Sequence, residues 1–296
     1  MLDPVRLFEF DPHVDRRTVR ADTLVVTLGS HDAGHTQRII DEHLLNTLPN
    51  YTLGRFDADQ LVDYGALRPR IAFDRDHFSD YRTPAIELHH LSDADRRGFL
   101  LLNGPEPSLQ WERVAATIDW LLNQFDITET VLVHGVPAPA PHTRAIHVSR
   151  YAGQGDVVPM DEAVPMMFEM GANFGSLLSL RLGEKGRKVT GLVAHVPHYL
   201  VTGDVPTAAI ALLERLSKHA QLALPVGRLP EAAALLRERV DAEVAESEEI
   251  QQMVGQLEHQ YDQFMSNRTL TAGADLPTAD EIGAQVEDFL RGLDED

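Results

Sequence analysis

The order strand, helix, strand between residues 99 and 134 is the feature that most restricts the fold of this chain. Residues 99–103 (Phe-Leu-Leu-Leu-Asn) and 130–134 (Thr-Val-Leu-Val-His) are apolar runs that can be buried on both faces of a sheet. Between them, apolar residues recur at helical spacing from Leu109 to Phe125. Such a βαβ unit places its two strands parallel, so Glu106 and His134 should lie at the same carboxyl edge of the sheet.

A similar strand, turn and helix precede this unit. Residues 23–28 (Thr-Leu-Val-Val-Thr-Leu) predict a buried strand, and a helix is expected from about His35 to Leu48. The turn between them contains Ser30, His31 and Asp32. Its backbone N–H groups could hold an anion, or Asp32 could simply cap the helix. The second interpretation is favoured, because the spacing matches neither the dinucleotide fingerprint nor the phosphate loop.

Further apolar segments extend this pattern to about residue 227. A turn-rich stretch between the strands predicted at 85–91 and 99–103 is typical of a hairpin, so the sheet should be mixed. We predict an α/β domain over residues 1–227 with a mixed, mostly parallel sheet. Its other elements are strands at 51–56, 71–74, 145–151 and 189–195, and helices at about 160–182 and from Asp204-Val205-Pro206 to about His219.

The last quarter of the chain has a different composition. From Arg228 onward there are 17 acidic and 5 basic residues, against a net charge of −20 for the whole chain. We predict an acidic helical extension over residues 228–296, with a long helix at 230–265 and a short helix at 278–293. Apolar residues in the long helix alternate in steps of four and three, as in a coiled coil: Ile250, Val254, Leu257, Tyr261 and Phe264.

Composition excludes several classes of function. A net charge of −20 argues against nucleic acid or an anionic membrane as a partner, since both require a basic surface. The chain has no cysteine, which excludes disulfides, thiolate catalysis and zinc–thiolate sites. No apolar run is long enough to span a membrane, and the charged amino terminus is unlike a signal peptide. We therefore expect a cytoplasmic protein.

Histidine, arginine and carboxylate side chains follow the predicted strands. The strand at 130–134 runs into a proline-rich loop with His142 and Arg144, and the strand at 189–195 ends near His195 and His198. Open α/β sheets gather such loops at one carboxyl edge, where ligands bind. The candidate pocket therefore comprises Ser30, His31, Asp32, Glu106, His134, His142, Arg144, His195 and His198.

Each of these residues also has a simpler explanation. A single loop histidine more often bonds a nearby carbonyl than a ligand, and Arg144 could form an ion pair with Glu106 or Asp32. No compact metal motif is present, although His31 with His35, or His195 with His198, could contribute ligands. Ser30 lacks the nucleophile elbow of serine hydrolases. We expect no metal and no cofactor.

Three motifs carry a family resemblance: Leu-Leu-Asn-Gly-Pro-Glu-Pro at 101–107 with Trp111, Pro-His-Thr-Arg at 141–144, and Val-Pro-His-Tyr at 196–199. Over roughly residues 5–225 the chain resembles the proteasome-assembly-chaperone family of the second-subunit type, in its bacterial branch. The resemblance implies a three-layer αβα fold, with helices on both faces of the sheet, like that of nucleoside phosphorylases and hydrolases. It also implies assembly into homo- or hetero-oligomers, with a trimer as the expected form.

Two hypotheses about function follow. The first is a non-catalytic oligomeric scaffold, resembling an assembly chaperone, that binds a protein through its α/β face or its C-terminal helices. The second is a hydrolase- or phosphorylase-like enzyme or sensor that uses the His, Glu and Arg residues of the candidate pocket. Relatives that act on proteasomes often dock through a terminal hydrophobic-tyrosine-any motif, whereas residues 294–296 here are Asp-Glu-Asp. Docking by that device is therefore not expected.

Overall fold

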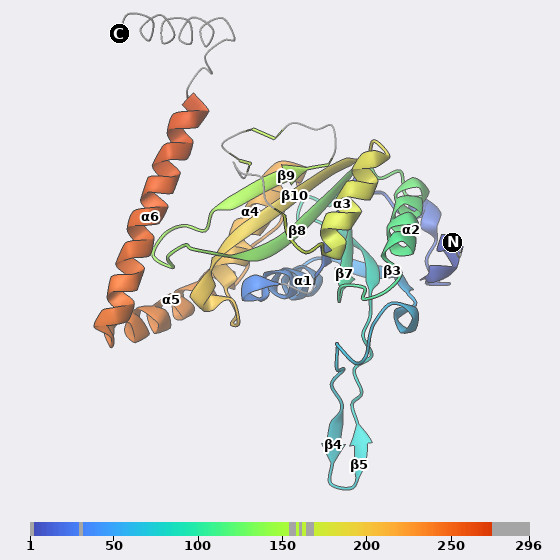
Figure 1. Ribbon diagram of the computed structural model, residues 1–296. Helices are drawn as coiled ribbons and strands as arrows, with labels where there is room; N and C mark the ends of the chain where they lie inside the picture. Colours follow the sequence, from blue (N-terminus) through green and yellow to red (C-terminus); the bar gives the residue numbers. More distant parts are fainter. Residues whose placement is uncertain (1–2, 30–31, 154–157, 160–161, 164–168, 274–296) are drawn as a thin grey trace, which may run out of the picture.

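A computed structural model describes residues 3–29, 32–153, 158–159, 162–163 and 169–273 (Figure 1). Its centre is an eight-stranded sheet in the order β1-β3-β6-β7-β2-β8-β10-β9. The strands are β1 (Phe8–Phe10), β2 (Thr23–Leu28), β3 (Asn50–Phe56), β6 (Glu87–Ser92), β7 (Gly98–Gly104), β8 (Glu129–Ala138), β9 (Val148–Ala152) and β10 (Lys188–Pro197).

The sheet is mixed, as the sequence predicts. Strands β7, β2, β8 and β10 are parallel to one another and form its centre. Antiparallel strands flank them, with the predicted hairpin formed by β6 and β7 and with β9 pairing on β10. Five strands (β3, β7, β2, β8 and β10) therefore run in one direction, and β1, β6 and β9 run in the other.

Helices cover both faces of the sheet and confirm the three-layer architecture. Along β2, Leu24 and Val26 point to one apolar cluster and Val25 to the other, because successive strand side chains alternate. The first cluster includes α2 (Trp111–Gln124) and α3 (Phe174–Glu184), and the second includes α1 (Thr36–Thr47) and α4 (Pro206–Ala220). Short 3-10 helices lie at Pro4–Leu7, Arg16–Thr18, Ala33–His35, Ala58–Gln60 and His198–Leu200.

Two predicted boundaries are wrong. The helix expected from about 160 begins only at Phe174, and the described residues 169–173 before it are not helical. Asn173 and Ser176 form a capping box, a local signal that starts a helix there. Strand β8 continues past His134 to Ala138, because β10 pairs with it along the whole segment and overrides the local glycine and proline pattern.

The single long helix predicted at 230–265 is also wrong. The chain instead forms α5 (Leu229–Ala245) and α6 (Glu248–Gly273), which diverge at a corner around Ser247 (Figure 1). Ser247 Oγ accepts a bond from the N–H of Ile250 at 3.4 Å, and two glutamates follow in the first turn of α6. This is the usual chemistry of a helix start. The helix predicted at 278–293 lies outside the described residues.

A small hairpin of β4 (Ala72–Asp74) and β5 (His77–Ser79) projects from the body of the molecule (Figure 1). The strand predicted at 71–74 thus exists, but it belongs to this separate two-stranded sheet. Within the part of the chain that the structure describes, no helix is both long enough and apolar enough to cross a membrane.

Candidate functional site

Asp32 lies in the turn after β2 and binds the start of α1. Its Oδ1 accepts the backbone N–H of Gln37 at 2.8 Å, and its Oδ2 accepts that of Arg38 at 3.1 Å. Burial raises the pKa of the Asp32 carboxyl, against the opposing effect of these bonds. Asp32 thus holds the first turn of α1 in place. Ser30 and His31 lie outside the described residues.

Glu106 follows β7 and binds the start of α3. Its Oε1 accepts the backbone N–H of Phe174 at 2.6 Å. A carboxylate at this end of a helix is favoured, because the first N–H groups are unpaired within the helix and carry partial positive charge. The side chain therefore joins the carboxyl end of β7 to α3.

His134 lies on β8 beside a small cavity of about 30 Å³, which has room for roughly one water molecule. Its ring packs against Tyr151, with centroids 6.2 Å apart. Burial lowers the pKa of His134 to about 4, so the imidazole is neutral at pH 7. The described residues around the cavity are Val26, Leu28, Gly29, Gln37, Leu132, Val133, His134, Asn173 and Gly175.

His142 is held between the α/β body and α5. The Tyr199 hydroxyl lies 2.7 Å from His142 Nδ1 and accepts the His142 backbone N–H at 2.7 Å. On the other side of the ring, Nε2 lies 3.0 Å from Oδ1 of Asp241. Burial opposes ionisation of Asp241, but hydrogen bonds from Arg237 and His142 together lower its pKa. Arg237 also donates to the backbone carbonyl of His142, at 3.1 Å.

Arg144 is bound by two carboxylates of α6. Its Nε and Nη2 donate to the two oxygens of Asp262, each at 2.9 Å, and its Nη1 donates to Glu258 at 3.1 Å. The guanidinium lowers the pKa of Asp262. The neighbouring Thr143 hydroxyl also donates to Glu258. The ion pair that the sequence suggested with Glu106 or Asp32 is therefore made with the C-terminal helix instead.

His195 and His198 lie at the end of β10 and have separate surroundings. Nε2 of His195 is 2.9 Å from the hydroxyl of the buried Ser149, and its ring lies 5.0 Å from that of His147. His198 is exposed and packs edge-on against Tyr199, with ring centroids 5.3 Å apart.

The candidate residues therefore divide among several local environments. Asp32 and Glu106 bind the starts of α1 and α3, and residues of both helices line the cavity beside His134. His142 and Arg144 face α5 and α6. Among the described residues, no group of three or more His, Asp or Glu side chains is arranged to hold a metal ion.

The partners of the proline-rich loop were not predicted. Tyr199, Asp241, Glu258 and Asp262 lie 57 to 118 residues from the loop residues that they bind. One signal was available, since Glu258 and Asp262 are four residues apart and so share a face of a helix that is otherwise short of cations.

A second polar cluster, beneath α1, was also missed. Thr27 donates to Asp41 at 2.7 Å, and burial raises the pKa of Asp41 well above its usual value. Nearby, His89 lies 3.1 Å from Asn103 and 3.1 Å from the Thr52 hydroxyl. Polar residues inside the predicted strands were the available signal for this cluster.

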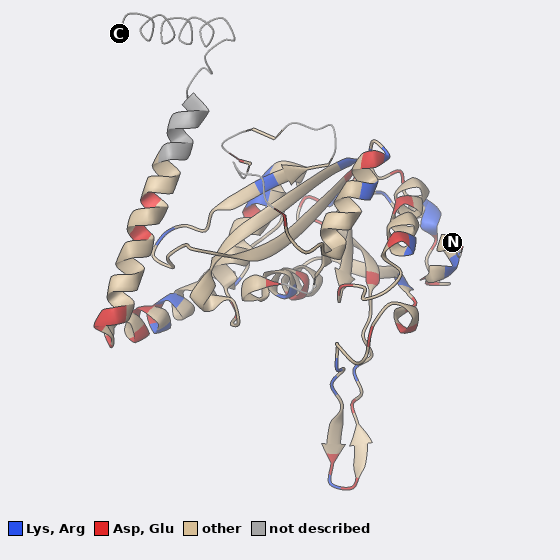
Figure 2. Ribbon diagram, viewed as in Figure 1, with Lys and Arg blue, Asp and Glu red and all other residues tan. Residues whose placement is uncertain are grey.

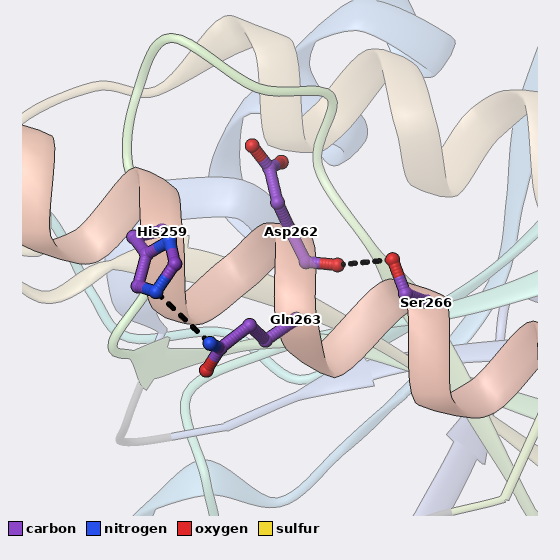
Figure 3. Close-up of a pocket in the computed structure, with 4 residues that line it drawn as sticks. All are labelled: His259, Asp262, Gln263 and Ser266. Carbon is purple, nitrogen blue, oxygen red and sulfur yellow. Dashed lines mark hydrogen bonds between the residues drawn. The ribbon is translucent and has the colours of Figure 1, made fainter.

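An open hollow of about 580 Å³ lies along α6. The described residues that line it are His259, Asp262, Gln263 and Ser266, all from this one helix (Figure 3). His259 lies 2.9 Å from Gln263, and Ser266 donates to the backbone carbonyl of Asp262 at 2.8 Å, while the Asp262 carboxylate is taken up by its bonds with Arg144. The hollow brings together no catalytic groups from other described elements.

Comparisons with known proteins place this architecture among solved folds. The model of the PAC2 family matches residues 26–244. No curated protein matches the chain at a significant level. A protein of unknown function from Mycobacterium tuberculosis, Rv2714, has 33% sequence identity and a TM-score of 0.83, with 90% of this chain and 92% of that one covered.

Two other solved structures show the range of similarity. A protein of unknown function from Corynebacterium glutamicum has 30% identity and a TM-score of 0.81, with 89% of this chain and 100% of that one covered. The proteasome-assembly chaperone homologue Rv2125 of M. tuberculosis has 22% identity and a TM-score of 0.71, with 78% of this chain and 99% of that one covered. At 22% identity, the similarity to Rv2125 shows a shared fold only.

Proposed function

Because this chain belongs to the PAC2 family, we propose that it is a non-catalytic, protein-binding scaffold of the cytoplasm that acts as an oligomer in the manner of an assembly chaperone. One relative of similar fold is described as a proteasome-assembly chaperone homologue, and another, from Pyrococcus furiosus, as an archaeal proteasome activator. The proposal extends this kind of role, binding and assembling other proteins, to the present chain.

The proposal is supported by the contacts of four candidate side chains, each of which joins one element of the fold to another. Asp32 and Glu106 accept backbone N–H groups of α1 and α3, while His142 and Arg144 bind carboxylates of α5 and α6. A catalytic site needs such groups to converge on one space that admits a substrate. The cavity beside His134 has room for about one water, which supports the scaffold over the enzyme hypothesis.

The projecting β4–β5 hairpin is the surface that we propose for self-association. Phe73 and Phe78 form a cross-strand pair with ring centroids 5.1 Å apart, yet they are 62% and 68% exposed. Ile71 and Tyr81 beside them are also about half exposed, at 50% and 52%. An isolated two-stranded hairpin is marginally stable in water, so a second copy that covers these rings would stabilise it. The form we propose is a homotrimer.

Substituting both aromatic residues of the hairpin tests this surface. Phe73→Ser with Phe78→Ser should lower the oligomer mass measured by light scattering while leaving the melting of the α/β body unchanged. Leu235→Ser is the matched control, because Leu235 on α5 is equally exposed, at 68%. The hairpin interface is wrong if the double variant keeps the mass of the natural chain.

Binding to a proteasome is tested separately. The full chain should comigrate on native gels with purified proteasome subunits from the same organism, before they form complete particles. A thermal-shift screen with metabolites and divalent metals examines the enzyme hypothesis in parallel, since a ligand of the native state raises the melting temperature. A specific metabolite shift without any subunit binding would favour the enzyme or sensor over the scaffold.

A further inference from the structure

The loop of residues 141–145, here called the signature loop, carries the Pro-His-Thr-Arg motif and is the place where the C-terminal helices meet the α/β body. Among the described side chains, each charged contact between the loop and α5 or α6 joins a basic or imidazole group of the loop to a carboxylate of a helix. These pairs are His142 with Asp241, and Arg144 with Glu258 and Asp262. The contact is therefore complementary in charge.

The contact with α6 has the form of helix recognition. Glu258 and Asp262 are one turn apart, and the planar guanidinium of Arg144 binds both, using two parallel bonds of 2.9 Å to Asp262. The Tyr261 hydroxyl donates to the backbone carbonyl of Ala145 at 2.7 Å. The loop thus binds two carboxylates and one intervening tyrosine on a single face of α6.

An apolar stripe accompanies these polar contacts. Val254 and Leu257 on α6 are buried, at 6% and 7% exposure, although they lie on a helix whose other residues are mostly exposed. Phe264, further along, packs edge-on against His147 just after the signature loop, with ring centroids 6.1 Å apart. The side of α6 that carries Glu258 and Asp262 therefore also carries buried apolar side chains, as in amphipathic helices that dock into grooves.

The PAC2 family model covers the signature loop but not α6, the helix that binds the loop. The model matches residues 26–244, so it includes the signature loop and most of α5 but ends before α6. The part of the chain shared with the family thus carries a surface suited to an acidic helix, and in this chain a segment outside the matched region occupies it.

We propose that the signature loop is a receptor for an acidic amphipathic helix of a partner protein, and that α6 occupies it as an intramolecular substitute for that helix. The inference rests on the proposed protein-binding function and names the surface and the partner chemistry. The partner helix carries two carboxylates four residues apart, with apolar side chains on the same face.

The structure makes exchange between α6 and a partner feasible. The ion pairs of Arg144 lie at the surface, since its side chain is 36% exposed and that of Asp262 is 53% exposed. Such pairs contribute specificity more than affinity. Because α6 is part of the same chain, its effective concentration at the loop is high. A partner helix must therefore bind the loop with high affinity to displace α6.

The experiment uses the full chain and a fluorescent peptide of residues 248–266 as the helix. In the variant Glu258→Arg with Asp262→Arg, α6 should leave the loop, and fluorescence anisotropy should show peptide binding at least tenfold tighter than to the natural chain. In the single variant Arg144→Glu, whose α6 keeps Glu258 and Asp262, the natural peptide should not bind, whereas a peptide with the same two arginine substitutions should bind. The control Glu243→Arg with Glu246→Arg makes the same change of charge at exposed carboxylates near the end of α5, for which no ion pair is seen among the described residues, and it should behave as the natural chain does.

Each outcome decides the proposal. Hydrogen exchange first establishes whether α6 is released in the variant, and Asp262→Arg alone replaces the double change if the double variant unfolds. Release without peptide binding overturns the receptor. If the oligomer mass of the natural chain falls in the variant, the loop binds α6 of a second copy, which also overturns the proposal. The oligomer mass of the natural chain is measured independently, so failure of the scaffold hypothesis is seen separately.

Discussion

His134 owes its neutral state to the way in which β8, β9 and β10 surround it. Its ring lies against Tyr151, and Tyr151 in turn lies over Gly191 of β10. A Cβ atom at Gly191 would come within 1.9 Å of the Tyr151 ring, so only glycine leaves room for the ring there. The backbone of β10 thus positions the tyrosine that covers the imidazole.

The pKa of His134 makes the stability of the protein depend on pH. Since burial lowers this pKa from 6.5 to about 4, the unfolded chain binds more protons than the folded one between these values. Its contribution is present above about pH 6.5 and is lost as pH falls toward 4. Relative to His134→Gln, the natural chain should lose up to about 3 kcal/mol of unfolding free energy between pH 7 and pH 4.

Denaturant titrations at several pH values measure this difference. His13→Gln is the control, because His13 is exposed and its substitution should leave the pH dependence unchanged. A constant difference between the natural chain and His134→Gln across this range would contradict the buried neutral imidazole.

At the scale of elements, periodicity identified the central strands, whereas the three layers were implied by the family resemblance. Strands β2, β7 and β8 are apolar on both faces, which a sequence shows directly. The extension of β8 to Ala138 was missed because pairing with β10, 59 residues away along the chain, decides it. The corner at Ser247 was missed because one serine in a charged run is a weak signal.

Helix α6 offers a direct test of element stability. Gly255 is exposed in its interior, and a Cβ atom there would meet no atom within 4 Å. Gly255→Ala should therefore stabilise α6 by up to about 1 kcal/mol, which slows amide exchange in the helix roughly fivefold. By contrast, Gly191→Ala should lower the free energy of unfolding of the whole protein, because the added Cβ atom would force the Tyr151 ring to move. Faster exchange in Gly255→Ala would show that this glycine has a packing role.

At the scale of the whole molecule, the charges of α5 and α6 decide how they attach to the α/β body. Carboxylates lie along both helices and are concentrated at the corner between them (Figure 2). The sequence singled out His142 and Arg144 but could not supply their partners, because the fold brings together segments about a hundred residues apart. Conversely, Glu106 was correctly placed at the carboxyl end of β7, whereas its bond to α3 required the position of that helix.

Salt should therefore loosen the attachment of α6 without loosening the sheet. Raising NaCl from 0.1 M to 1 M shortens the Debye length from about 10 Å to about 3 Å, which weakens exposed ion pairs such as that between Arg144 and Asp262. Amide exchange in α6 should become faster while exchange in β2 and β8 stays constant. In Arg144→Gln the exchange in α6 should already be fast and should respond little to salt. Equal acceleration in the sheet would contradict this account.

The long strand β8 has a consequence for solubility. After Leu132 it is paired on one side only, since β2 ends its pairing there while β10 continues to Ala138. An unpaired strand edge can recruit strands of other molecules and begin aggregation, but here the 3-10 helix at Ala33–His35 lies against it, since a Cβ atom at Gly135 would come within 2.6 Å of the Ala33 carbonyl oxygen. Here the Val133 carbonyl is occupied by Gln37 at 2.8 Å, and Pro137 offers no N–H group. Gln37 and Pro137 thus let β8 extend past β2 without serving as a template for intermolecular β-structure.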